Sequence, residues 1–488
     1  MASFKKFDAD AISTDPDLAS IYRSMRELAT EFAVLGQIET AKKLISLLLS
    51  EYSSEWQLQQ LRALKFAFAE ADQWPEEIPP EGRTEEELAK VVEQITPELG
   101  NDSDAVEDDP SELGVLFMTA TNCDASTGGA AMGRSSALAK ALAVAIRLAS
   151  KHTSSIDEIE ADENVQKALG LISTRMHANH AIEDLTRHRD NWRLLATGAL
   201  ARKIPVDMEK LKALGKEAVE LFTERVNNGR KTHVTEKKSI RELLEVLDRN
   251  TKKNSRGFYE EMMENVPESL FILPPATDEQ IAALERKLDV PLPDDYKEFL
   301  KISNGFGRTW NGYHLDDPIF GVEDLDWGEV YVEDLPVVLH PLLSGVMDLE
   351  LPGGREWPCH KKPVILGSYD VLQTWFITPS NTKETLEAYK EFMEGSETPD
   401  DVKRYTRKLI ISRYGSWEAF EKLDWVAMEM DEGISEACGS FTQFLQFRAR
   451  KAAMGVWEGE GEREARSIAY TCMADRIEPN ESKRQRIE

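Results

Sequence analysis

Four side chains with the chemistry of metal ligands recur at helical spacing in the first half of this 488-residue chain: His177, His180, Asp184 and His188. If one helix carried all four, they would share a single face. Imidazole nitrogens and a carboxylate suit a transition metal, so a metal-dependent hydrolase is one hypothesis for this face. The apolar stripe of the segment lies about a third of a turn away, which makes a solvated polar face the alternative that we favour.

A glycine-rich stretch at residues 127–134 precedes a helical pattern, as phosphate-binding loops do. Gly128, Gly133 and Ser135 have the Walker spacing, but Arg134 stands where that motif requires lysine. No strand pattern comes immediately before the glycines. We therefore interpret the stretch as a flexible loop without phosphate chemistry.

Other motifs of common enzymes are missing from the sequence. It contains no G-x-S-x-G elbow, no H-E-x-x-H and no C-x-x-C pair. The four cysteines, Cys123, Cys359, Cys438 and Cys472, are scattered, as is typical of a reducing compartment. We expect a protein that is not an enzyme and that has no cofactor.

The formal net charge of −29 restricts the classes of partner. Such an acidic chain is disfavoured for nonspecific nucleic-acid binding and for anionic membranes, and it favours basic protein partners. The longest apolar run, residues 137–149, is interrupted by Lys140 and Arg147 and is too short for membrane insertion. We expect a cytoplasmic protein, with the nucleus as the alternative because residues 483–486 form a short basic run.

The pattern of expected helices and strands predicts a multidomain chain with an all-α N-terminal half. Residues 1–74 predict a helical hairpin region, which near residues 20–50 resembles one tetratricopeptide-like unit; an unspecialised helical pair is the alternative. Residues 75–134 predict an acidic, glycine-rich linker with one short helix at 85–96, capped by Thr84. Residues 135–265 predict a helical domain, either a bundle or a repeat-like array.

The stretch from Leu273 to Gly307 predicts two short helices with a proline-marked joint. Thr277 and Gln280 have the spacing of a capping box, and an apolar stripe follows them. Pro291 and Pro293 end the first helix, because proline lacks the backbone donor and restricts the residue before it. The second helix begins with two aspartates, Asp294 and Asp295, and ends at Asn304-Gly305.

This stretch resembles the opening of the SUKH superfamily, the domain of fungal cell-wall-assembly regulators and of bacterial toxin-immunity proteins. The resemblance extends over roughly residues 265–450 and implies a binding and regulatory module linked to cell-wall assembly and growth signalling. The matching residues are Leu273-Pro274, Ile281, Glu285, Leu292-Pro293, Tyr296, Phe299-Leu300 and Asn304-Gly305.

Residues 266–450 therefore predict an α+β domain with an antiparallel sheet, followed by a charged tail at 451–488. A hairpin with a four-residue connection is expected around Gly367–Asp370, and a helical pattern covers residues 416–430. Ser440 is the expected cap of a terminal helix. Weaker strand candidates are Trp310–Leu315, Pro318–Val322 and Val337–His340.

Aromatic residues supply the candidate partner-binding surface, since tryptophan and tyrosine dominate binding hot spots. Seven of the ten tryptophans lie beyond residue 309, and we select Trp310, Tyr313, Trp327 and Tyr369, which fall in or near predicted loops. The alternative is that these rings fill the core. Two functions follow: a regulator that binds protein partners through the α+β domain, or a helical scaffold whose N-terminal half is the main binder. The sequence leaves the oligomeric state open.

Overall fold

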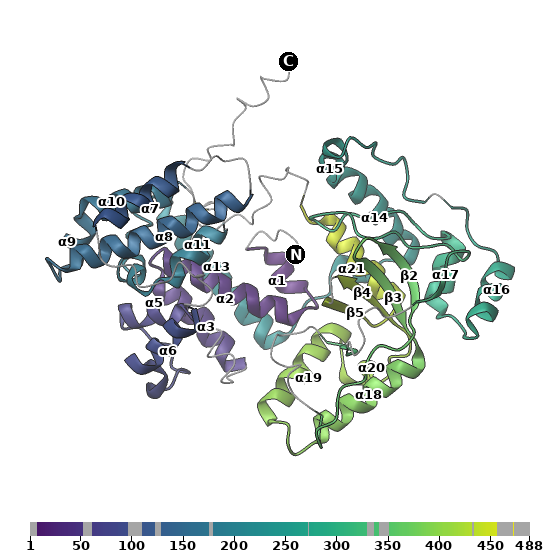
Figure 1. The fold of residues 1–488 in the computed structure, drawn as a ribbon. Helices are drawn as coiled ribbons and strands as arrows, with labels where there is room; N and C mark the ends of the chain where they lie inside the picture. Colours follow the sequence, from purple (N-terminus) through teal and green to yellow (C-terminus); the bar gives the residue numbers. More distant parts are fainter. Residues whose placement is uncertain are drawn as a thin grey trace. The chain divides into compact units, whose positions relative to one another are not determined.

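The computed structural model describes residues 7–51, 61–95, 110–122, 128–174, 179–271, 273–328, 336–340, 351–431, 434–455 and 472. The chain divides into two compact units (Figure 1). The helical unit contains residues 5–12, 22–228 and 464–488, and the α+β unit contains residues 1–4, 13–21 and 229–463. An all-α half followed by an α+β part is thus confirmed, and each unit is described separately below.

The helical unit is built around one long, apolar helix, α8 (Gly128–Ser150), against which α7, α10 and α11 pack. Its alanines and leucines between Ala137 and Ala149 are buried, except for the partly buried Leu148. The other elements are α2 (Leu18–Val34), α3 (Ile38–Glu51), α5 (Leu64–Ala71), η1 (Pro80–Arg83), α6 (Glu85–Ile95), α7 (Pro110–Asn122), α9 (Ile156–Ala161), α10 (Glu163–Ser173), α11 (Asn179–Arg187), η4 (Arg189–Asn191), α12 (Trp192–Leu195) and α13 (Met208–Asn228). A short helix α1 (Ala9–Thr14) precedes them in the chain.

The predicted hairpin near residues 20–50 is present as α2 and α3. Gly36 joins them with a positive φ of 74°, and a Cβ at this position would lie 2.5 Å from the Cα of Gly198. Only glycine therefore fits this close approach of two backbones. Helix α3 packs against α13, which comes much later in the chain. The hairpin is confirmed, whereas its tetratricopeptide character stays a prediction.

The predicted linker at 75–134 is wrong for the residues that the structure describes. Helix α6 begins after Thr84, as expected, and buries Leu88, Val91 and Ile95. Helix α7, which we did not predict, buries Leu113 and Phe117. The glycine-rich stretch from Gly128 onward forms the first turns of α8 instead of a loop.

The α+β unit contains a five-stranded antiparallel sheet with strand order β1-β2-β3-β4-β5. Figure 1 labels β2, β3, β4 and β5 of this sheet. The strands are β1 (Asp326–Trp327), β2 (Val364–Tyr369), β3 (Leu372–Ile377), β4 (Val426–Asp431) and β5 (Ile434–Cys438). The helical elements are η5 (Val234–Lys237), α14 (Ile240–Asn254), α15 (Arg256–Glu261), α16 (Asp278–Leu288), α17 (Asp294–Ile302), α18 (Pro379–Glu394), α19 (Asp400–Tyr414), α20 (Trp417–Phe420) and α21 (Phe441–Ala453).

Helices cover both faces of this sheet, because successive strand residues point to opposite sides. Phe376 packs with residues of α14, α16, α17 and α21, whereas its neighbours Trp375 and Ile377 pack with α18, α19 and α20. Tyr296 and Phe299 of α17 are completely buried in the first of these cores. The expectation that they are core residues is therefore confirmed.

The two helices predicted after Leu273 are confirmed as α16 and α17. The Thr277 hydroxyl accepts the Gln280 N–H at 3.2 Å, and the Gln280 side chain accepts the Thr277 N–H at 2.9 Å. Ser440 caps α21 as expected, accepting the Gln443 N–H at 3.2 Å. Local capping chemistry was thus a reliable guide here.

Other expectations for this unit are wrong. The β2–β3 connection has two residues, Asp370 and Val371, since Tyr369 already pairs with Leu372. Residues 416–430 hold the short α20 and then β4, not one helix. Of the weaker strand candidates, Trp310–Leu315 and Pro318–Val322 contribute only isolated bridges, such as Trp310 with Leu315, and Val337–His340 is not in a strand. The predicted boundary at 265/266 shifts to 228/229, because Ile240, Leu243 and Leu247 of α14 join the core beneath the sheet.

Among the described helices, none is both long enough and apolar enough to cross a membrane. The tail from residue 456 onward, with the basic run at 483–486, lies outside the described residues except for the buried Cys472.

Candidate partner-binding site

The four predicted metal ligands do not share one helical face. His177 lies outside the described residues, and α11 spans residues 179–187, so His188 follows the helix on extended backbone. Burial and the nearby Arg147 lower the pKa of His188 to about 4. Asp184 lies 3.6 Å from the Arg187 guanidinium. In the part of the chain that the structure describes, no three candidate ligands gather into a metal site.

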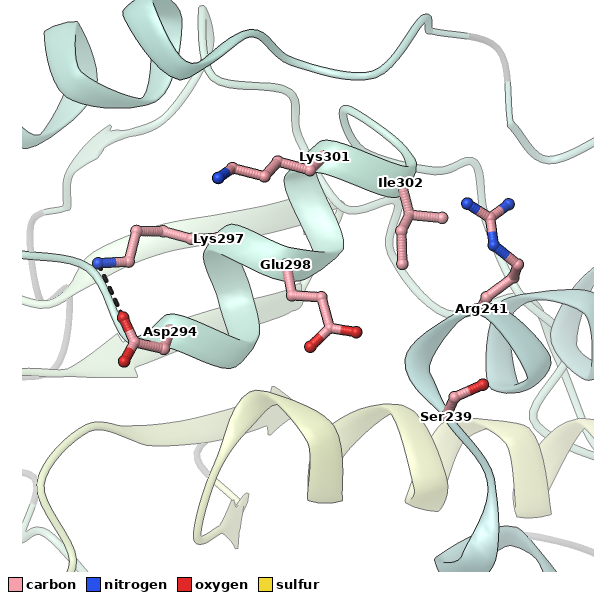
Figure 2. Close-up of a pocket in the computed structure, with 7 residues that line it drawn as sticks. All are labelled: Ser239, Arg241, Asp294, Lys297, Glu298, Lys301 and Ile302. Atoms are coloured by element: carbon pink, nitrogen blue, oxygen red, sulfur yellow. Dashed lines mark ion pairs between the residues drawn. The ribbon is translucent and has the colours of Figure 1, made fainter.

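An open depression of about 780 Å³ lies between the start of α14 and the exposed side of α17 (Figure 2). Charged side chains dominate its lining, which consists of Ser239, Arg241, Asp294, Lys297, Glu298, Lys301 and Ile302. Small-molecule sites are usually enclosed and mostly apolar. This depression therefore lacks the character of a catalytic pocket.

The loop from Arg308 to Asp317 carries two of the predicted partner-binding residues. Its turn is closed by Asn311, whose Oδ1 accepts the N–H groups of Tyr313 and His314, each at 2.9 Å. The Asn311 amide also donates to Asp316 at 2.6 Å. Tyr313 is half-buried at this turn, and the hydrogen bonds fix the backbone that presents it.

Trp310 is not a surface residue, which corrects the prediction. Its side chain is 1% exposed and packs with Phe258 and Tyr259. The indole N–H donates to the carbonyl oxygens of Met454 and Gly455, at 3.3 and 3.1 Å. A buried indole needs such an acceptor, and the end of α21 provides it. Trp310 therefore anchors the loop from within the core.

Tyr369 is the predicted residue that the structure exposes best. It ends β2, is 47% exposed, and stacks on the Arg308 guanidinium, whose carbon lies 3.5 Å from the ring centroid. Arg308 in turn donates to the Leu315 carbonyl at 2.7 Å. The adjacent turn residue Val371 is 49% exposed. We call Arg308, Tyr369 and Val371 the hairpin surface.

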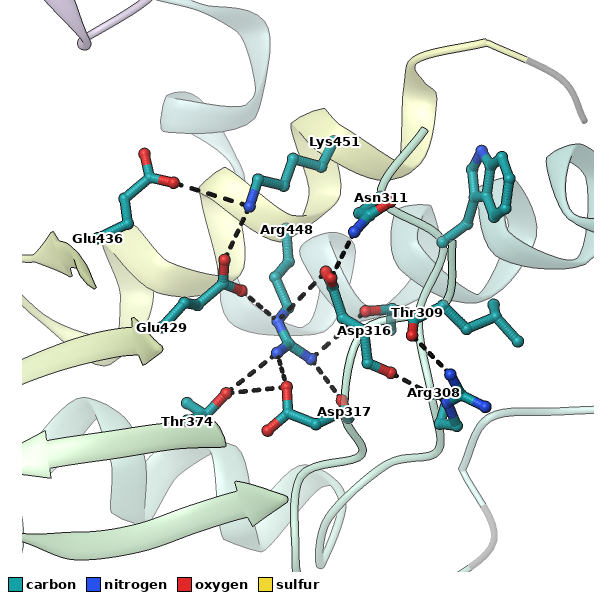
Figure 3. A network of polar contacts seen from close by, with 12 residues as sticks. Arg308, Thr309, Asn311, Asp316, Asp317, Thr374, Glu429, Glu436, Arg448 and Lys451 are labelled. Atoms are coloured by element: carbon teal, nitrogen blue, oxygen red, sulfur yellow. Dashed lines mark hydrogen bonds and ion pairs between the residues drawn. The ribbon is translucent and has the colours of Figure 1, made fainter. Parts of the chain in front are cut away.

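A buried ionic network lies behind the loop (Figure 3). Arg448 of α21 is 1% exposed, pairs with Asp317, and donates to Glu429 at 2.7 Å. It also donates to the Asp317 carbonyl at 2.7 Å and to Thr374 of β3 at 3.0 Å. One guanidinium thus connects the loop, the sheet and the terminal helix, which holds the base of the loop in one position.

Further charges extend this network along α21. Lys451 lies 2.8 Å from Glu429 and 3.7 Å from Glu436, and the cations Lys451 and Arg448 hold the pKa of Glu429 down to about 2 against its burial. Burial and the neighbouring Glu429 instead raise the pKa of Asp316. The pKa values of these two buried carboxylates therefore shift in opposite directions, because Glu429 contacts the cations more closely than Asp316 does.

Trp327 lies apart from the hairpin surface. It sits in β1, half-buried, and pairs with Val364 at the start of β2, whereas Tyr369 ends that strand. Five residues of strand separate the two positions by about 17 Å. The four predicted aromatics therefore form no single patch. Sequence reasoning missed two neighbours of Tyr369, the half-buried Arg308 and the exposed Val371.

A protein-family model matches part of the α+β unit. Residues 275–351 match the SMI1 / KNR4 family (SUKH-1). These residues are thus similar to a SUKH domain. Comparison with curated proteins and with solved structures gave no significant match.

The matched part of the SUKH domain includes α16, α17, the Arg308–Asp317 loop and β1. The match ends before β2, yet β2, β3 and β4 pair in one sheet with β1 and share its core. The domain's matched loop and the later Tyr369 meet in the hairpin surface. The resemblance seen in the sequence is confirmed within residues 275–351.

Proposed function

We propose that this chain is a non-catalytic regulator that recognises a protein partner through its SUKH domain. The observation that carries the proposal is the Arg308–Tyr369 stack, in which an exposed ring at the end of β2 packs on an arginine of the loop that a buried ionic network supports. Tyrosine and arginine are the residues that contribute most at binding hot spots. Because both side chains are held before a partner arrives, binding loses little conformational entropy.

Cell-wall assembly and growth signalling are the processes that we propose for this regulator. They rest on the resemblance to fungal SUKH members and on the family match at 275–351. The partner is a protein with an apolar or aromatic contact flanked by a hydrogen-bond acceptor, which would complement Tyr369, Val371 and the Arg308 guanidinium.

A helical scaffold is the second candidate, and one observation favours it. Helix α7 exposes Val115 and Met118, at 54% and 55%, one helical turn apart. Residues three apart lie on the same face of a helix, so these two form a small apolar stripe. In this alternative the helical unit is the main binding surface.

Point variants of the full chain separate the two candidates in cells that produce the protein. Partners recovered by proximity labelling are compared between the wild type, Tyr369→Ala and Met118→Asp. We expect Tyr369→Ala to reduce labelling of specific partners at least fivefold, with Met118→Asp unchanged. Loss with Met118→Asp alone would favour the scaffold and contradict the proposal.

A further inference from the structure

A short segment near the start of the chain packs on the α+β unit. Residues 13–21 belong to this compact unit, although its main part begins only at residue 229. We call residues 13–17 the strap: they form the end of α1 and the connection to α2. The Asp17 carboxylate accepts the Ser20 N–H at 3.1 Å, which fixes the point at which the strap ends and α2 begins.

The α+β unit holds the strap by its main chain. The Ser13 carbonyl accepts the Lys231 N–H at 2.7 Å, near the start of the unit's main part. Further along the strap, the Pro16 carbonyl accepts the Ser412 hydroxyl of α19 at 2.9 Å. Hydrogen bonds to main-chain groups are the contacts by which proteins bind extended segments of a partner. The strap is therefore held in the way that a bound peptide is held.

Between these two bonds, the Asp15 carboxylate interacts with two largely buried arginines without satisfying them. Arg450 of α21 lies 3.6 Å from Asp15, which is too far for a hydrogen bond, and its side chain is 12% exposed. Arg413 of α19 also acts on Asp15 electrostatically, and its side chain is 6% exposed. Arg450 Nη2 and Arg413 Nε are buried without a hydrogen-bond acceptor in the described part of the chain. Burial raises the pKa of Asp15 even though both arginines oppose the shift.

The site requires an acidic occupant, because one of its cations has no other counter-charge. Asp15 is the carboxylate that pairs with Arg450, and the described residues supply no second one within 4.0 Å. Arg413 pairs with Glu436 of β5 at 3.1 Å and therefore keeps a partner when the strap leaves. An unpaired cation in a buried position is costly. Loss of the strap would thus leave Arg450 uncompensated until another carboxylate replaces Asp15.

We propose that the strap occupies, in cis, a site at which the α+β unit binds an extended acidic segment of a partner protein, so that strap and partner compete. The occupant seen in the structure is a peptide main chain that carries a carboxylate, which favours a peptide over a nucleic acid or an anionic bilayer. Arg308, Tyr369 and Val371 take no part in these contacts, so this inference does not rest on the proposed function.

The preferred partner residue is a glutamate at the position of Asp15. Its side chain is longer by one methylene, so its carboxylate can approach the arginine donors that Asp15 leaves without acceptors. The strap compensates for its poorer fit by its attachment to the chain, which gives it a high effective concentration. A partner with the better side chain can therefore displace the strap.

Fluorescence anisotropy with the purified full chain tests the proposal. The probe is a fluorescein-labelled peptide with the sequence of residues 11–19 in which glutamate replaces Asp15. We expect weak binding to the wild-type chain, because the strap blocks the site. Asp15→Lys adds a third cation beside Arg450 and Arg413 and should expel the strap, so the peptide should bind this variant at least tenfold more tightly. Adding Arg450→Ala should remove the gain.

Two controls separate binding at the site from nonspecific attraction. Glu27→Lys makes the same change of net charge at an exposed position of α2, and we expect its affinity to stay within twofold of wild type. A probe with glutamine at the position of Asp15 should show no saturable binding. Misfolding of Asp15→Lys cannot produce a gain that both controls lack. No saturable binding to Asp15→Lys, equal affinities of wild type and Asp15→Lys, or a gain that survives Arg450→Ala would overturn the proposal.

Discussion

Arg448 brings a full positive charge into the interior of the α+β unit, where it is 1% exposed. Its contacts offset the free-energy cost of burying this charge, since Asp317 and Glu429 supply carboxylates and Thr374 supplies a hydroxyl. Removing one partner of a buried pair leaves the other charge without compensation. The sequence held a signal for this role, because Arg448 continues the apolar stripe of Phe441, Phe444 and Leu445 on α21.

Arg448→Ala should therefore lower the free energy of unfolding by about 3–5 kcal/mol. Urea unfolding followed by tryptophan fluorescence measures the change, since most tryptophans lie in this unit. Arg404→Ala, on the exposed side of α19, is the matched control and should change stability by less than about 0.5 kcal/mol. A loss below 1 kcal/mol for Arg448→Ala would contradict a supporting role for the network.

His340 makes the same unit sensitive to acid. Burial and the nearby Arg413 lower its pKa from 6.5 to about 4. Tyr389 lies 2.5 Å from Nδ1, and its hydroxyl also accepts the Leu339 N–H, so the hydroxyl proton is directed to a neutral imidazole. The unfolded chain binds the proton more readily between pH 4 and 6.5, so stability falls as pH falls through this window.

At pH 5, compared with pH 7, His340 should account for a loss of about 2 kcal/mol. His340→Gln cannot titrate and should reduce the pH-dependent loss by that amount in urea unfolding at the two pH values. His152→Gln, at an exposed position, should keep the wild-type pH dependence. An unchanged loss in His340→Gln would show that the imidazole is not buried in its neutral form.

The β2–β3 hairpin is the element that depends most on a single glycine. A Cβ at Gly367 would overlap the Pro318 carbonyl oxygen and lie 2.6 Å from Asp317 Oδ2. The pairing register also shifts between Ile365 and Gly367. The missing side chain thus lets β2 approach the loop that carries Asp317, which in turn contacts Arg448.

Gly367→Ala should destabilise the chain by about 2–3 kcal/mol, because the loop must move away from the strand. Gly170→Ala is the matched control: no atom lies within 4 Å of its added Cβ inside α10, so we expect a gain of about 0.5–1 kcal/mol. Both values come from urea unfolding. Equal effects of the two substitutions would contradict the close approach at Gly367.

The sequence predicted helix starts correctly where nearby side chains determine them. It failed where packing against distant elements determines whether a segment is a helix or a strand. The capping box at Thr277 and the cap at Ser440 fix helix starts from side chains a few residues away. A helical pattern was predicted over residues 416–430, but residues 426–431 form the strand β4, because β3 and β5 flank it. Such pairing involves partners that local periodicity does not contain.

At the scale of the whole molecule, the family match and the helical first half were predictable, but the candidate site was only partly so. Tyr369 is exposed as predicted, whereas Trp310 fills a core and Trp327, in β1, pairs with the opposite end of β2. Arg308 was missed because nothing near it in the sequence reveals that β2 ends beside it.

Photo-crosslinking from the hairpin surface tests the central claim most directly. The full chain carries a photoreactive phenylalanine analogue either at Val371, beside Tyr369, or at Met118 on α7, both about half exposed. We predict that a protein partner crosslinks at position 371, that the crosslink disappears when Tyr369→Ala is added, and that position 118 gives none. Crosslinks confined to position 118, or a crosslink at 371 that survives Tyr369→Ala, would contradict recognition through the SUKH domain.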